Sequence, residues 1–189
     1  MKSPRLAVLL TTAALMVACG QSDSSAPNPN APEPTVAGDI PDNQVFVPYT
    51  SADGRFTVTV PEGWARTADG TAVVFTDKFN SVRVEAVSRP RAPTATSVTT
   101  DEVPTLRSLP GFRAGVVKSV HRTAGEVVLI TYEMSSPPDP VTGKRITESV
   151  QRYDYWHDGT EAVLTLSGPK GADNVDPWRT VTDSFRWLG

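Results

Sequence analysis

Cysteine, histidine and long apolar runs are scarce in this sequence of 189 residues. It has one cysteine, Cys19, and two histidines, His121 and His157. Because no cysteine follows residue 19, the rest of the chain can form neither an internal disulfide bond nor a thiolate metal site. The apolar run at residues 6–17 has 12 residues, whereas a membrane-spanning helix needs about 20. That run is too short to be a permanent membrane anchor.

Residues 1–18 have the three zones of a secretory signal. Lys2 and Arg5 make the start positive, residues 6–17 form the apolar middle, and Ala18 is a small residue at the exit. The pattern therefore predicts export of the chain to the extracytoplasmic side of the cell membrane.

The residues around Cys19 read LMVAC and resemble a bacterial lipobox, with Met16 where that motif usually has leucine. The resemblance implies cleavage before Cys19, a diacylglycerol thioether on its sulfur and an acyl chain such as palmitate on its amine. Each buried methylene contributes about 0.8 kcal/mol, so two or three chains make a durable anchor. The alternatives are an ordinary secretory signal with an incidental cysteine, or an uncleaved start.

Residues 19–44 are predicted to form a tether. Between Gly20 and Asn43 there are five prolines, four acidic residues, and no aromatic or basic residue. Such a segment buries too little apolar surface to offset its ordering entropy. Residues 45–189 then form one domain with 16 basic and 17 acidic residues. This near-neutral balance lacks the basic footprint of a nucleic-acid-binding protein, and the domain is expected to be a monomer.

Strand signals dominate residues 45–189. Short spacers such as Asp69-Gly70 and Asp158-Gly159 are typical of hairpins between antiparallel strands. The run at residues 126–134 is apolar on both faces, which indicates a sheet covered on both sides. The predicted fold class is α+β, an antiparallel sheet of about six to eight strands covered by helices. The predicted strands lie at residues 55–60, 71–76, 81–87, 115–123, 126–134, 145–157 and 161–168.

Two helices are predicted as covers. The first runs to Leu109 and starts at Thr100 or Asp101, because Pro104 must lie close to the start. The second has Asp176 as N-cap and Pro177 as its first residue, with the apolar stripe Trp178, Val181 and Phe185. We interpret Asp101 and Glu102 as charges that complement the dipole at the first helix's start.

The order of these features resembles the PsbP-like α/β/α sandwich and, among bacteria, the LpqN-like envelope lipoproteins of actinobacteria. It includes Pro61, Gly63 and Trp64 after a strand, the two-faced strand to Tyr132, and a closing helix at Ser184-Phe185. The resemblance implies a non-catalytic scaffold that binds protein partners, and for some LpqN-like members an association with envelope glycolipids. It gives no binding residue that can be carried over.

Catalytic and metal-binding motifs are missing from the sequence. Neither histidine has a ligand-spaced His, Asp or Glu partner, so no metal, cofactor or catalytic residue is expected. In the predicted strand 145–157, we interpret Trp156 as core, and Tyr153 and Tyr155, which share a face with His157, as half-exposed cover. The alternative is that these tyrosines line a surface for sugars or lipid headgroups.

Three arginines of matching parity, Arg83, Arg89 and Arg91, predict a solvated edge, with an anionic-ligand site as the alternative. The sequence thus favours a lipid-anchored, non-catalytic binding module for an envelope lipid, a glycolipid or a membrane-protein partner. The alternative is a hydrolase with dispersed residues, which requires Tyr153, His157 or acids with perturbed pKa values to meet in one cleft.

Overall fold

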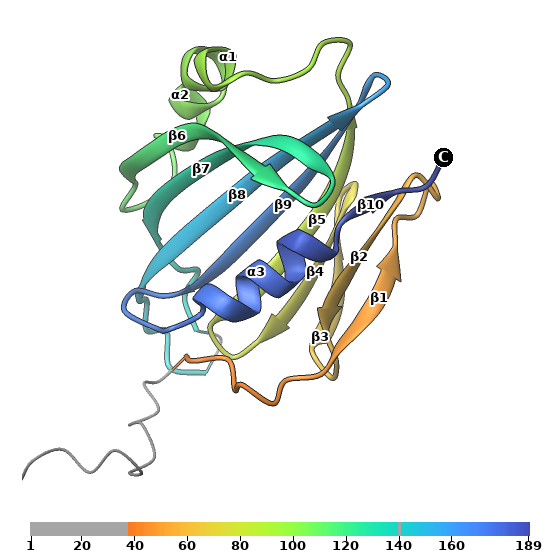
Figure 1. Ribbon diagram of the computed structural model, residues 1–189. Coiled ribbons are helices and arrows are strands. Elements are labelled where there is room, and N and C mark those ends of the chain that lie inside the picture. Colours follow the sequence, from red (N-terminus) through yellow and green to blue (C-terminus); the bar gives the residue numbers. More distant parts are fainter. Residues whose placement is uncertain (1–37, 140) are drawn as a thin grey trace, which may run out of the picture. The chain divides into compact units, whose positions relative to one another are not determined.

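The computed structural model describes residues 38–139 and 141–189 (Figure 1). The described part of the chain holds two antiparallel sheets and three helices. In chain order the elements are β1 (Phe46–Thr50), β2 (Phe56–Pro61), β3 (Ala65–Asp69), β4 (Ala72–Asp77), β5 (Asn80–Ser88), α1 (Ala95–Asp101), α2 (Val103–Leu106), β6 (Arg113–Arg122), β7 (Gly125–Ser135), β8 (Thr147–His157), β9 (Thr160–Pro169), α3 (Val175–Ser184) and β10 (Arg186–Trp187).

A seven-stranded sheet has the order β3-β4-β5-β9-β8-β7-β6, and a small sheet has the order β1-β2-β10. Every pair is antiparallel. The predicted fold class is therefore confirmed, and each of the seven predicted strands exists. Three further strands were not predicted. They are β1, β3, which is exposed along its whole length, and β10, which has only two residues.

Other elements pack against both faces of the large sheet, as the two-faced run at residues 126–134 predicted. One face packs against α3 and the small sheet around Phe56, Tyr155 and Phe185, which are all fully buried. Figure 1 shows α3 crossing this face, with β1 and β2 beside it. The other face meets α1 through Val98, which packs with Ile130 and other apolar side chains. We call these the core face and the outer face.

The first predicted helix begins earlier than expected. Its N-cap is Thr94, whose side chain accepts from the backbone of Ser97 while the Ser97 hydroxyl accepts from Thr94. The helix ends at Asp101, Glu102 is the cap residue between the two helices, and Pro104 lies in the first turn of the separate short helix α2. Pro104 lacks an N–H and cannot sit inside one continuous helix. The prediction of a start at Thr100 or Asp101 is therefore wrong.

The closing helix also starts earlier than predicted, with Asn174 rather than Asp176 at the N-cap position. The Asn174 side chain makes no cap bond. It accepts from the Ile40 backbone N–H at 2.8 Å and donates to the Gly38 carbonyl and to Asn80. The predicted apolar stripe is confirmed, since Trp178, Val181 and Phe185 are buried.

The hydrogen bonds from Asn174 to Gly38 and Ile40 show that the packed domain starts earlier than the predicted boundary at residue 45. Residues 38–44 belong to the last part of the predicted tether, yet Ile40 is 4% exposed and lies in the main core. The Asn80 amide donates to the Gly38 carbonyl at 2.9 Å. The packed domain therefore includes residues from Gly38 on, and a single buried isoleucine with two asparagines holds them.

Candidate ligand-binding groove

The outer face of the large sheet is only partly covered by α1 and α2. One row of cross-strand partners on this face, from β4 to β8, consists of Thr76, Ser81, Ser167 and Val150. Short side chains in this row leave space between the sheet and the segments at its two ends. Two adjoining cavities form there and share Val74, Ser81, Met134 and Ser167. We call them together the sheet groove.

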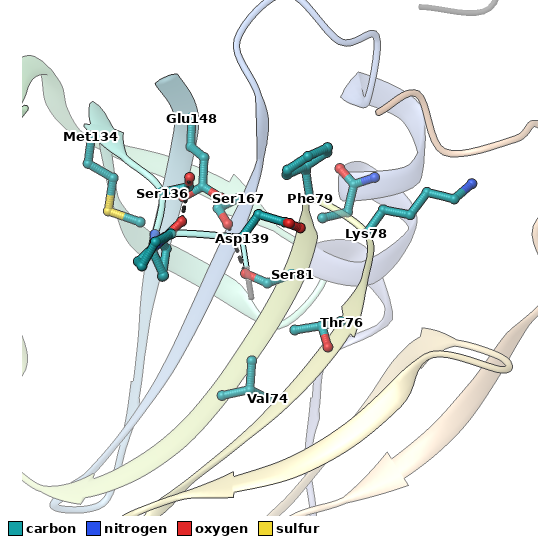
Figure 2. A pocket seen from close by; sticks show the side chains of 13 residues that line it. Val74, Thr76, Lys78, Phe79, Ser81, Met134, Ser136, Asp139, Glu148 and Ser167 are labelled. Carbon is teal, nitrogen blue, oxygen red and sulfur yellow. Dashed lines mark hydrogen bonds between the residues drawn. The ribbon is translucent and has the colours of Figure 1, made fainter. Parts of the chain in front are cut away.

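The first part of the groove, the Glu148 cavity, has a volume of about 320 Å³ (Figure 2). The β4–β5 turn and the segment after β7 close it on two sides. Its apolar wall includes Phe79, Met134, Pro137 and Pro138, and its polar groups are mostly uncharged. The volume lies at the lower end of the range of about 300–1,000 Å³ found for small-molecule sites.

Glu148 is the unusual group in this cavity. It lies on β8 and is 6% exposed. Its carboxyl forms no hydrogen bond or ion pair with any residue in the described ranges, 38–139 and 141–189. Burial alone raises the pKa of Glu148 to about 7, because a charged carboxylate is poorly solvated there. The cavity thus contains a buried acid without a partner.

The second part of the groove, the helix-side cavity, has a volume of about 330 Å³. Leu106 of α2 and Tyr132 of β7 supply apolar surface, and Arg83, Glu85 and Arg152 supply charge. Arg83 is bonded to Glu85 at 2.6 Å and to Asp69 at 3.1 Å. Its charge is therefore already balanced by two carboxylates.

Beyond this cavity lies a network of ion pairs that we call the charge cluster. It contains Arg89, Glu102, Arg152, Asp154 and Glu161. Arg89 contacts Glu102 at 2.5 Å and Glu161 at 2.9 Å. Arg152 contacts Glu102 and is bonded to Asp154 at 2.8 Å. Glu102 follows α1 directly, so the cluster ties the α1–α2 segment to β8 and β9.

The charge cluster does not fit a metal ion, although its three carboxylates offer ligand atoms within 4.8 Å of one another. Two guanidinium groups already occupy the positions beside these oxygens. Burial raises the pKa of Asp154 to about 7 and also raises the pKa of Glu161. Protonation is thus a second way to lower the negative charge, and the cluster is best explained as structural.

The sequence interpretation of Tyr153, Tyr155 and Trp156 is wrong. Both tyrosines lie on the core face, with exposures of 2% and 0%. Trp156 is only partly buried on the outer face, where its indole N–H donates to the Arg89 carbonyl at 2.8 Å. Parity was assigned correctly, but the polar residues beside Trp156 mark the less covered face. The tyrosines line no ligand surface.

Other predicted site residues are placed as follows. His157 is exposed and lies beside the Trp187 ring, with 5.5 Å between ring centroids. Arg83 and Arg89 are partly buried and paired, which contradicts a solvated edge, and only Arg91 is exposed. Asp101 ends α1 and so lies at no helix start, whereas Glu102 is the N-cap of α2, but its side chain makes no cap bond and joins the charge cluster instead. Cys19 and most of the predicted tether lie outside the described residues.

Glu148 itself was not singled out from the sequence. A signal was present, because this acid stands between Ile146 and Val150 on one face of a predicted strand. A lone carboxyl in an apolar alternation is a candidate for a buried functional group. Its lack of a partner depends on distant segments, β4–β5 and residues 136–139, and only the structure shows it.

No protein-family model matches the sequence, and no curated protein matches it. The structure is similar to solved structures at low sequence identity. The solution structure of cyanobacterial PsbP from Synechocystis superposes with a TM-score of 0.57 at 15% identity, covering 80% of this chain and 98% of that one. At this identity the likeness shows the fold alone, and it confirms the predicted PsbP-like fold.

Two other matches complete the comparison. A crystal structure from Bacteroides thetaiotaomicron gives a TM-score of 0.52 at 12% identity, covering 75% of this chain and 48% of that chain, so this chain spans about half its length. LpqN from Mycobacterium tuberculosis, described as involved in cell envelope biogenesis, gives a TM-score of 0.44 at 15% identity, covering 78% of this chain and 93% of that chain. The TM-score of 0.44 for LpqN is too low to support an argument about function.

Proposed function

We propose that this protein is a lipid-anchored, extracytoplasmic binding module without catalytic activity, and that it holds an amphipathic envelope molecule, a lipid or glycolipid, in the sheet groove. The observation that carries the proposal is the groove itself, two adjoining cavities that combine apolar side chains with hydroxyl and charged groups. That combination is typical of small-molecule sites.

A protein partner is the weaker candidate. The large apolar side chains exposed in the described residues are Val45, Val116, Val141, Val175 and Leu188. They come from separate parts of the fold rather than from one strand or helix face. Scattered exposed apolar residues are normal on a soluble surface, whereas a contiguous patch marks an interface.

The hydrolase alternative loses its predicted constellation. Tyr153 lies in the core and His157 beside Trp187, whereas the acids with raised pKa values lie on the outer face; they are Glu148, Asp154 and Glu161. Asp139 also lines the Glu148 cavity, but its carboxylate accepts three bonds from Val141 and Thr142. One carboxyl without a nucleophile or second acid beside it supports binding better than hydrolysis.

The test is native extraction of the full protein from membranes, followed by mass spectrometry of what accompanies it. Val74 borders both cavities, so Val74→Trp should fill the groove. We expect an amphipathic small molecule with the wild type, and none with Val74→Trp. Thr180→Trp, on the exposed side of α3, is the matched control and should retain the molecule. A stoichiometric membrane protein in its place, unaffected by Val74→Trp, would contradict the proposal.

The anchor is tested separately. None of the helices in the described residues has the length and hydropathy that a membrane span requires. We expect Cys19→Ser to leave the domain folded and to move the protein from the membrane to the soluble fraction. Mass analysis of the mature N-terminus should show an acylated Cys19. A bare sulfur, or cleavage downstream of it, would refute the anchor.

A further inference from the structure

The sheet groove contains one group that a neutral lipid-binding cavity does not need. Glu148 is more than nine-tenths buried, borders the cavity and has no partner in the described residues. Its carboxyl oxygens open onto the cavity, yet burial of the side chain still raises its pKa, because the charged form is poorly solvated there. An apolar residue of similar length at position 148 would avoid this poorly solvated charge.

The other polar groups of the Glu148 cavity are mostly engaged in bonds within the protein. The Ser81 and Ser167 hydroxyls bond to each other at 2.8 Å. Ser136 uses its proton on the Pro137 carbonyl, and the Asn80 amide donates to the Gly38 carbonyl. One hydroxyl proton of the Ser81–Ser167 pair stays free, and Thr76 and Lys78 also border the cavity, so its lining offers donors as well as acceptors. The carboxyl of Glu148 is its acceptor without a partner in the described residues, and it favours a ligand with donors over an anionic one.

We propose that the Glu148 cavity binds the ammonium group of an amphipathic ligand, with the ligand's apolar part along the rest of the sheet groove. This proposal rests on the proposed function of the groove and adds the chemistry of the headgroup. An ammonium has three donors and a positive charge. Its hydrogen bonds to a carboxylate are stronger than those between neutral groups. The cavity wall also includes Phe79, and aromatic rings attract cations.

Few titratable groups face Glu148. Asp139 comes from the segment after β7 and Lys78 from the β4–β5 turn, and both border the cavity. Tyr132 on β7 lies close enough for Glu148 to influence its pKa. β9 contributes Ser167 and Pro169, which do not titrate. Hydrogen bonds from its own turn lower the pKa of Asp139, so Glu148 is the carboxyl that titrates near neutral pH.

The experiment uses three probes that differ only in the headgroup: octylamine, 1-octanol and octanoate. Binding to the full chain carrying Cys19→Ser is measured by calorimetry or NMR. At pH 8 we expect octylamine to bind roughly tenfold more tightly than 1-octanol, the ratio that one charge-assisted hydrogen bond gives. Octanoate should bind more weakly than either. At pH 5.5, where Glu148 is protonated, the preference for octylamine should disappear.

Two variants complete the test. Glu148→Gln keeps the shape of the side chain and should remove both the amine preference and its pH dependence. Glu133→Gln is the matched control, because Glu133 lies on the neighbouring strand, faces away from the groove and pairs with Lys170. It should retain both. Equal binding of octylamine and 1-octanol would overturn the ammonium proposal and leave the groove function standing. No binding of any probe would overturn both.

Discussion

Replacing Glu148 by glutamine should remove a pH dependence from the stability of the protein. Burial raises the pKa of this carboxyl from 4.5 to about 7, so the folded state holds the proton more tightly than the unfolded state. Protonation of Glu148 therefore stabilises the fold. This stability is fully present below the unfolded pKa of about 4.5 and is lost as the pH rises through about 7.

The magnitude follows from the two pKa values. One pKa unit corresponds to about 1.4 kcal/mol. Between pH 5 and pH 8 the Glu148 contribution to the free energy of unfolding should fall by about 2.5 kcal/mol. Asp154 titrates with the same sign, but it lies six residues further along β8, roughly 20 Å away. Its effect should therefore be common to the wild type and the variant.

Urea unfolding at pH 5 and pH 8 measures this difference. We expect the wild type to lose about 2–3 kcal/mol more than Glu148→Gln between the two pH values. Any cost of burying the glutamine amide is the same at both pH values and cancels. Glu133→Gln should follow the wild type. Parallel pH profiles for the wild type and Glu148→Gln would show that the carboxyl is solvated or paired, and would refute the reasoning.

Two further predictions concern the segments that frame the groove. Glu102→Gln removes the shared partner of Arg89 and Arg152 and should lower the free energy of unfolding by about 1–3 kcal/mol, with faster amide exchange in α1 and α2. The control Asp101→Asn changes an exposed residue and should have little effect. Equal effects of the two variants would show that the charge cluster does not hold this segment. Asn174→Ala leaves the buried Ile40 N–H without its acceptor and should cost about 2–3 kcal/mol, with loss of exchange protection at Ile40. Asp176→Ala should cost less than 1 kcal/mol, and the reverse order would restore Asp176 as the helix cap.

The sequence predicted most of the sheet because its information is local. Alternating residues and short turns define β4 to β9, and the two-faced β7 predicts that both faces are covered. The start of the first helix was wrong because Thr94 and Ser97 cap it earlier and Pro104 belongs to a second helix, and the side chains at the N-cap positions of α2 and α3, Glu102 and Asn174, bond to distant partners, Arg152 and Ile40. Neither contact has a pattern in the sequence around it.

The candidate site was missed for a related reason. Tyr153 and Tyr155 seemed suited to a surface because tyrosine has a polar end, yet Tyr155 satisfies its hydroxyl inside the core by donating to the Thr182 carbonyl at 2.8 Å. Polar residues on the opposite parity were read as a sign of partial exposure only. They include both the paired charges and the unpaired Glu148, and sequence alone does not separate these two groups.

The difference between the paired charges and the unpaired Glu148 is the main reason to place function at the Glu148 end of the outer face. Asp154 is buried and bonded to the partly buried Arg152, and Arg152 also pairs with Glu102, which holds α1 and α2 over the sheet. Glu148, on the same strand and the same face, has no such compensation in the described residues. Asp154 keeps one buried oxygen without a partner, but its other oxygen accepts from Arg152, whereas no contact in the described residues offsets a charge on Glu148. The stability that Glu148 removes at neutral pH is therefore best explained by a cationic partner outside the chain, and the sheet groove is where that partner can bind.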